Sequence, residues 1–182
     1  MRTHLAHVST SAERAATLTK QLLTYARRQK VDLQPLNLNQ IIERMKPLLW
    51  RTIGENYLLT DTLDATLWNV RANASQMEQV LTNLVINARD AMPNGGAIHI
   101  VTENYIIQSS SVQSIELPVG EYVRLAVTDK GTGIPLEVQS RIFEPFFTTK
   151  EVGKGSGLGL ATCYGIVRQC SGSISVESEI GA

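Results

Sequence analysis

The stretch SQMEQVLTNLVINARDAM at 75–92 restricts the possible folds more than any other part of this sequence. Its apolar residues recur every three or four positions, which is the spacing of one face of an α-helix. Such a helix has to bury that face against another layer of the same domain. The residues of the face are Met77, Val80, Leu81, Leu84, Val85, Ala88 and Met92.

The segments around this helix supply candidates for the covering layer. AIHIVTENYII follows the turn residues Asn94-Gly95-Gly96 and is typical of a strand, and EYVRLAVTD at 121–129 alternates like a second one. Strands and helices mix without strict alternation, so we expect an α/β (α+β) two-layer sandwich with a mixed, mostly antiparallel sheet packed on helices. Further expected elements are a helix at 36–53 interrupted near Pro47, one or two strands at 56–70, a short helix at 135–143, a helix at 158–170 and a strand at 173–178.

One long helix is predicted to precede this domain. Residues 5–28 carry apolar or small residues at a 3-4-3-4 spacing, typical of a coiled coil or bundle. A helix with one narrow apolar stripe cannot bury that stripe by itself. The helix therefore packs on its own domain or, as we favour, pairs with other helices in a dimer. Residues 1–34 hold six Lys/Arg against two Asp/Glu, and we place a domain boundary between 34 and 35.

Charge and composition exclude some classes of protein. The formal net charge is +0, with 17 basic and 17 acidic residues, which argues against a nucleic-acid binder. We find no signal peptide and no apolar run of membrane-spanning length, and Cys163 and Cys170 are predicted to be unpaired thiols. These features favour a cytoplasmic location without membrane contact, while a membrane anchor elsewhere in a longer parent protein stays open. The ending SISVESEIGA reads as a strand that stops at a turn, so we expect one more strand after Gly181.

The helix at 75–92 also has an unusual polar face. Asn83, Asn87 and Asp90 lie at i, i+4 and i+7, opposite the apolar stripe. Asn and Asp are poor residues for the middle of a helix, although an ordinary solvated face would accept each of them. Amide oxygens are suitable ligands for Mg²⁺, which makes this face a candidate metal and phosphate site.

A second candidate is TDKGTGIP at 128–135, where Asp129 follows a predicted strand. An Asp-Gly turn is one explanation of this stretch. The other is a binding site in which the carboxylate accepts a hydrogen bond from a ligand amine, while Gly131 and Gly133 allow a close approach.

The third candidate is GKGSGLGLA at 153–161, where glycine occupies every second position. A Walker A loop is excluded because Gly155 follows Lys154, and the G-x-G-x-x-G pattern is excluded because position 160 is leucine. What remains is a glycine loop that opens a helix and so presents free backbone N–H groups to an anion, unless it is simply a flexible surface loop. Thr148, Thr149 and Lys150 precede it.

In this order, Asn87, Asp129-x-Gly131-x-Gly133, RIFEPFFTTK at 141–150 and GSGLGLA at 155–161 resemble the ATP-binding domain of sensor histidine kinases. The resemblance covers residues 36–182, and residues 1–34 resemble the second helix of the kinase dimerisation hairpin. Gyrase, Hsp90 and MutL share the nucleotide fold but lack the RIFEPFFTTK stretch. The resemblance implies the Bergerat-type ATP-binding fold, with ATP and Mg²⁺ as cofactors, a response regulator receiver domain as partner and a homodimer formed through the hairpin helix.

The resemblance also implies roles for single residues. Asn87 would bind Mg²⁺ with support from Asn83, Asp129 would take the adenine amino group, and Ile134 would line the adenine pocket. Phe143, Phe146 and Phe147 would shape the loop over ATP. The remaining residues expected at ATP are Asp90, Gly131, Gly133, Thr149, Lys150, Gly155, Ser156, Gly157, Leu158 and Gly159.

One departure from the family pattern concerns the phosphoacceptor, a histidine followed by Asp or Glu. His4, His7 and His99 are followed by Leu, Val and Ile, so the acceptor and its neighbouring base are absent and the chain is predicted not to phosphorylate itself. Three alternatives remain open: an ATPase of the wider superfamily, a nucleotide-binding switch without kinase activity, and a dimerisation scaffold resting on 5–28 alone.

Overall fold

A computed structural model describes residues 32–108, 117–151 and 155–181, all within the compact unit Asp32–Ala182. The predicted helix at 5–28, with His4 and His7, lies outside the described residues, as does Lys154. None of the helices in the described part has the length and apolar character needed to cross a membrane. The elements are β1 (Gln34–Leu36), α2 (Leu38–Ile53), β2 (Tyr57–Leu63), β3 (Val70–Ala72), α3 (Ala74–Ala91), β4 (Gly96–Ile107), β5 (Gly120–Asp129), α4 (Leu136–Gln139) and α5 (Gly159–Gln169).

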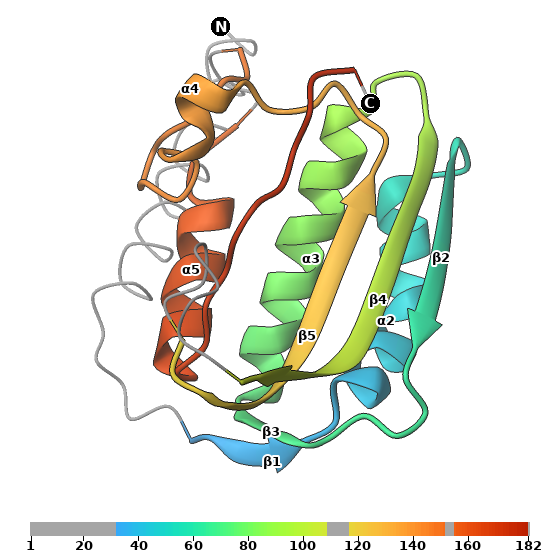
Figure 1. Cartoon of the computed structure of the whole chain (residues 1–182). Helices are drawn as coiled ribbons and strands as arrows, with labels where there is room; N and C mark the ends of the chain where they lie inside the picture. Colours follow the sequence, from blue (N-terminus) through green and yellow to red (C-terminus); the bar gives the residue numbers. More distant parts are fainter. Residues whose placement is uncertain (1–31, 109–116, 152–154, 182) are drawn as a thin grey trace, which may run out of the picture. The chain divides into compact units, whose positions relative to one another are not determined.

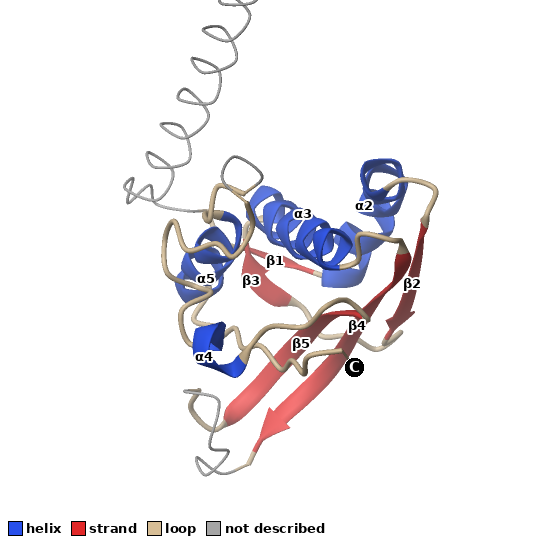
Figure 2. Cartoon of the chain, turned by 90° about the horizontal axis from the view of Figure 1, so that it is seen from above, coloured by secondary structure: helices blue, strands red, loops and turns tan. Residues whose placement is uncertain are grey.

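The predicted two-layer sandwich is confirmed, with α2, α3 and α5 covering one face of the main sheet (Figures 1 and 2). That sheet has the order β2-β4-β5, in which β4 pairs parallel with β2 and antiparallel with β5. A small antiparallel sheet of β1 and β3 lies at one end. No helix of the described part covers the other face of the main sheet (Figure 2), and along β4 buried residues alternate with more exposed ones.

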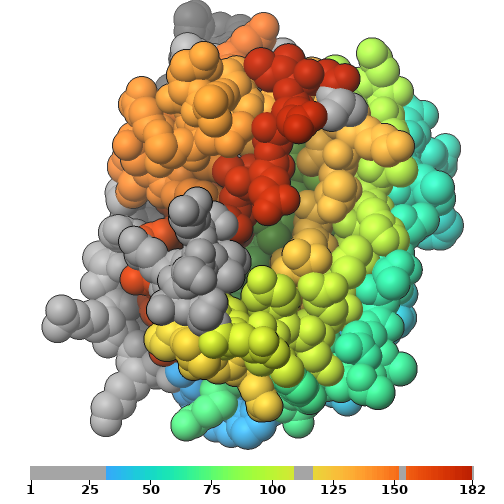
Figure 3. Space-filling view, viewed as in Figure 1, coloured from blue at the N-terminus to red at the C-terminus, as the bar shows by residue number. Residues whose placement is uncertain are grey.

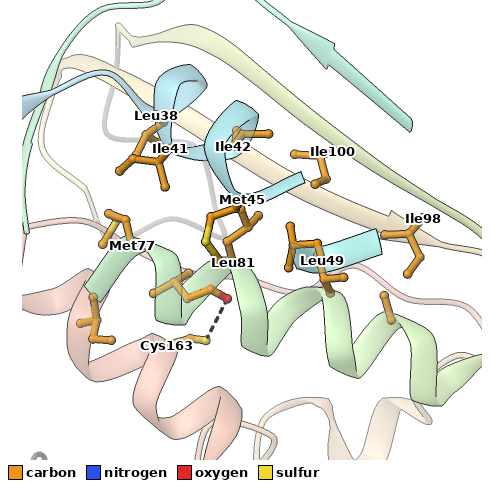
Figure 4. Packing of buried hydrophobic residues seen from close by; sticks show 14 of the residues in the cluster. Leu38, Ile41, Ile42, Met45, Leu49, Met77, Leu81, Ile98, Ile100 and Cys163 are labelled. Atoms are coloured by element: carbon orange, nitrogen blue, oxygen red, sulfur yellow. Dashed lines mark hydrogen bonds between the residues drawn. The ribbon is translucent and has the colours of Figure 1, made fainter. Parts of the chain in front are cut away.

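Helix α3 lies at the centre of the helical layer and carries the core. Asn73 caps its first turn by accepting a hydrogen bond from the Gln76 N–H at 3.2 Å, so the helix begins where an N-cap residue precedes the apolar periodicity. Its apolar face, with Leu81 and Val85 at most 1% exposed, packs toward α2 and the sheet (Figure 4). Cys163 of α5 closes the core from the other side and is fully buried.

The predicted interruption of the second helix near Pro47 is wrong, because α2 runs unbroken from Leu38 to Ile53. Pro47 lies on the exposed side of α2. Proline has no N–H, so the carbonyl four residues earlier receives no helical hydrogen bond from it, and water can bind that carbonyl instead. Met45 and Leu49, before and after it, continue the same buried stripe. Core packing therefore outweighs the local cost of the proline.

The predicted strand at 173–178 is also not formed. No backbone ladder joins this segment to β5 or to another strand among the residues described. A hollow lies between them, visible in Figure 3 between the C-terminal segment (red) and β5 (yellow-orange), with α3 (green) at its floor. We call it the β5 groove. Its lining includes residues 122–129 of β5, residues 172–179, several residues of α3 and the segment after β5. Because β5 is the edge of its sheet, its outer side has no partner strand among the described residues.

Candidate functional site

The polar face of α3 is turned toward the start of α5 rather than toward open solvent. The Asn83 amide Nδ2 donates to the Gly159 carbonyl at 3.1 Å. A methyl group added at Gly159 would lie 3.8 Å from Asn83 Cγ and from Asn87 Nδ2. Both asparagines are half-buried. They therefore converge on the first residue of α5, and an ordinary solvated face does not describe them.

The start of α5 has the features of an anion site. Its N-cap residue, Leu158, makes no side-chain capping bond. The first intrahelical bond is donated by the Thr162 N–H to the Leu158 carbonyl at 2.9 Å, so the preceding N–H groups of the first turn are left without intrahelical acceptors. Such groups, at the positive end of the helix dipole, are suited to a phosphate. The side-chain amides of Asn83 and Asn87 lie beside them, and amide oxygens are suitable ligands for Mg²⁺.

The glycine loop folds back on the phenylalanine-rich stretch before it. The Phe146 N–H donates to the Gly157 carbonyl at 2.9 Å, and Gly157 has φ 65°. A methyl group at Gly157 would lie 2.4 Å from the Phe146 carbonyl carbon, so only glycine fits this crossing. Phe146 itself has φ 67°, a strained conformation for an aromatic residue, and the residue is 54% exposed.

The other predicted residues of this loop take different positions. Ser156 Oγ accepts from the Leu158 N–H at 3.3 Å, and Leu158 is buried, so both support the turn into α5. Gly155 lies against Lys150, with 3.2 Å from an added methyl to Lys150 Cδ. Thr149 is exposed to solvent.

Asp129 ends β5 in an Asp-Gly turn at the C-terminal end of α3. Its Oδ1 accepts from the Gly131 N–H at 2.9 Å, and the Thr132 N–H donates to the Ala91 carbonyl at 3.0 Å. A methyl at Gly131 would lie 2.6 Å from Ala91 Cβ, which gives this glycine a packing reason. Gly133 has φ 73°, and a methyl group there would lie 2.1 Å from the Glu179 carbonyl oxygen, so this position also requires glycine.

The described residues contain no group of three or more His, Cys, Asp or Glu side chains that could hold a metal. A metal ion here would therefore depend on amide oxygens and on the phosphates of its ligand. Six residues expected at ATP or at the loop over it line the β5 groove: Asn87, Asp129, Gly131, Gly133, Ile134 and Phe143. Ile142 and Leu160 also line it. Asn83, Asp90, Phe146, Lys150 and the residues 155–159 lie outside this lining, around the start of α5 and the end of α3.

Asp90 forms an ionic cluster with Arg89 and Lys150. The Lys150 Nζ lies 2.6 Å from Asp90 Oδ2, and the Arg89 Nη2 lies 2.7 Å from Asp90 Oδ1. Burial alone would raise the pKa of Asp90, but hydrogen bonds from Lys150 and then Arg89 outweigh it and the pKa lies below its usual value. Sequence reasoning missed Arg89 as part of the site. Lys150 follows Asp90 by 60 positions, so no local signal in the sequence indicated their pairing.

Comparison with known proteins identifies the family of this chain. Residues 72–182 match the family described as histidine kinase-, DNA gyrase B-, and HSP90-like ATPase, and the chain belongs to that family. The sensor kinase CckA of Brucella abortus is 45% identical over 176 residues, which are 96% of this chain and 19% of that protein. The catalytic domain of the histidine kinase ThkA is 32% identical with a TM-score of 0.58, covering 76% of this chain and 81% of that one.

ThkA in complex with the response regulator protein TrrA is 28% identical with a TM-score of 0.64, covering 93% of this chain and 44% of that one. The predicted likeness to sensor histidine kinases is thus confirmed, and so is the Bergerat-type fold. Within the family the chain is of the sensor histidine kinase type. It spans less than half the length of the curated relatives CckA, sporulation kinase C and ZraS.

Proposed function

We propose that this chain binds ATP with Mg²⁺ and directs the γ-phosphoryl group to a histidine other than His4, His7 and His99, for relay to a response regulator receiver domain. The observation that carries the proposal is the convergence of Asn83 and Asn87 on the uncapped start of α5. Membership of the ATPase family and the likeness to ThkA, which has been solved with a response regulator, support it.

Each group at the site has a defined task in this proposal. Asn87 would hold the metal ion, with Asn83 fixing the α5 start beside it through the Gly159 carbonyl. The free N–H groups of the first α5 turn and the Lys150 ammonium would bind phosphate oxygens. Bound Mg²⁺ would offset phosphate charge, and the protein would contribute positioning and electrostatic stabilisation.

Asp129 would bind the adenine amino group. Its Oδ1 already accepts from the Gly131 N–H, which fixes the carboxylate and leaves Oδ2 for a ligand. Gly131 and Gly133 would keep the backbone close to the base, and Ile134 would supply an apolar wall.

The domain organisation supports the same proposal, because a compact unit begins at Asp32, near the predicted boundary. Residues 1–34 would belong to a dimerisation hairpin helix, so that two copies associate.

Calorimetric titration with a non-hydrolysable ATP analogue and Mg²⁺ tests the binding step. Asp129→Asn keeps an acceptor for the Gly131 N–H but removes the charge and one oxygen, so we expect at least a tenfold loss of affinity, since a charged acceptor contributes about 1.5–3 kcal/mol. Asn87→Ala should weaken binding in the presence of Mg²⁺ more than in its absence. Equal affinity of the wild type and Asp129→Asn would overturn the adenine assignment.

Incubation with ATP labelled on the γ-phosphate tests the transfer step. The chain alone should incorporate no label, because none of its histidines has the acidic neighbour expected of the acceptor. Label on His4 or His7 would contradict the proposal. Appreciable steady-state release of phosphate would instead indicate an ATPase of the wider superfamily.

A further inference from the structure

We infer that Asp90 is a positioning residue: it holds the Lys150 ammonium at the C-terminal end of α3, ready for a phosphate of ATP, without itself contacting the nucleotide. This inference rests on the proposed function and assigns Asp90 a different task from direct ATP binding.

The Asp90 carboxylate has neither oxygen free. Its Oδ1 accepts from Arg89 at 3.0 Å from Nε and 2.7 Å from Nη2, and its Oδ2 accepts from Lys150 Nζ at 2.6 Å. Arg89 is itself anchored, because its Nη1 donates to the Thr52 carbonyl in the last turn of α2 at 3.1 Å. A chain of hydrogen bonds therefore runs from α2 through Arg89 and Asp90 to the lysine.

Lys150 is held at the right place for an anion. It comes from the loop before α5, and the Lys150 stem lies against Gly155, 3.2 Å from the position of an added methyl. Its partner Asp90 follows Asn87 by three residues, which is nearly one turn of α3, so Asp90 holds the ammonium one turn beyond Asn87. An ammonium has three donors, and one bond to Asp90 leaves two for a ligand.

The charges argue against direct contact between Asp90 and the nucleotide. A carboxylate repels phosphate, and its oxygens here are already used by two cations. The cluster of Arg89, Asp90 and Lys150 carries a net charge of +1, which attracts an anion through Lys150. A lysine stem loses much rotamer freedom when its end is fixed, so fixing it before binding lowers the entropic cost of contacting phosphate.

The test compares ATP with adenosine, which lacks phosphate, as ligands of the whole chain in calorimetry with Mg²⁺. Asp90→Asn keeps the acceptor for Arg89 and the side-chain volume but presents an uncharged group to Lys150. We expect ATP to bind about five- to tenfold more weakly to this variant, with adenosine affinity unchanged. Lys150→Met should show the same loss, the double variant should bind no more weakly than Lys150→Met, and Asp90→Glu should recover part of the affinity.

A matched control is Asp61→Asn, which breaks the pair of Lys46 and Asp61. That pair has a similar distance, 2.8 Å, and similar exposure, 30% and 26% against 34% and 23% for Lys150 and Asp90. We expect no change in ATP affinity for Asp61→Asn.

Three results would overturn the inference. Tighter ATP binding by Asp90→Asn would make Asp90 a competitor of phosphate, and an equal loss of ATP and adenosine affinity in Asp90→Asn would make the role of Asp90 purely structural. Unchanged ATP affinity of Lys150→Met would show that Lys150 does not contact phosphate. Wild type that binds neither ligand would refute the proposed function instead.

Discussion

Replacing Gly133 by alanine should destabilise the domain through the contact between the turn after β5 and the C-terminal segment. Gly133 has φ 73°, which costs a residue with a side chain about 1 kcal/mol. An added Cβ would lie 2.1 Å from the Glu179 carbonyl oxygen, so the segment has to move away. Two hydrogen bonds then break, from the Ile134 N–H to Ser178 Oγ at 2.9 Å and from Gln139 Nε2 to the Ser178 carbonyl at 3.0 Å.

Each of these bonds contributes about 1 kcal/mol, so the total loss is about 3 kcal/mol in the free energy of unfolding. The assay is urea denaturation followed by circular dichroism, read as a lower midpoint at a similar slope. Gly165→Ala is the matched control, because Gly165 lies within α5 and has no atom within 4 Å of an added methyl. That variant should gain about 0.5–1 kcal/mol through helix propensity. A Gly133→Ala chain within about 0.5 kcal/mol of the wild type would refute the reasoning.

Three further predictions concern the core, the ionic cluster and the thiols. Leu81→Ala, at a side chain 1% exposed, should lower the free energy of unfolding by about 2–5 kcal/mol in the same assay, and a loss under about 1 kcal/mol would contradict the described packing. Folding lowers the pKa of Asp90, so its contribution to stability is present above its unfolded pKa of about 4 and is lost as the pH falls through the folded pKa. Asp90→Asn lacks this contribution and should lose less stability than the wild type between about pH 6 and pH 3. Equal losses in the two chains would contradict this prediction. Desolvation raises the pKa of Cys163 to about 11, and a hydrogen bond with Asn83 opposes this more weakly. In the folded chain near about pH 8, a thiol reagent should therefore modify the half-buried Cys170 faster than Cys163, and Cys163 should react only when the chain unfolds. Mass spectrometry of labelled peptides can check this order.

The sequence allows α3 and its polar face to be predicted because both depend on local periodicity. The glycine loop can also be predicted from local sequence, because its alternating glycines are visible there. The structure adds the steric reason at Gly157, where only glycine fits. The contacts of Gly131 and Gly133 with Ala91 and Glu179 could not be predicted, because they join segments distant in the chain.

The two errors in secondary structure both concern tertiary context, which local rules do not contain. Local rules interrupt a helix at Pro47, but burial of the α2 stripe keeps the helix whole. They also favour a strand at 173–178, but this segment lies across the β5 groove from β5 and pairs with no strand among the described residues. The pairing of Lys150 with Asp90 belongs to the same class of tertiary effect, because nothing in the local sequence of either residue predicts it.

The outer side of β5 affects how the chain behaves in solution. Within the described residues this ten-residue strand pairs only with β4, and a strand edge without a partner is a template for pairing with the strand of another molecule, and hence for aggregation. Charged side chains on the strand oppose this, and Arg124 is held in an ion pair with Glu103 of β4 at 2.6 Å. Colloidal stability of this chain should therefore depend on the charge of β5, and neutralising Arg124 should promote concentration-dependent self-association unless another strand covers the edge.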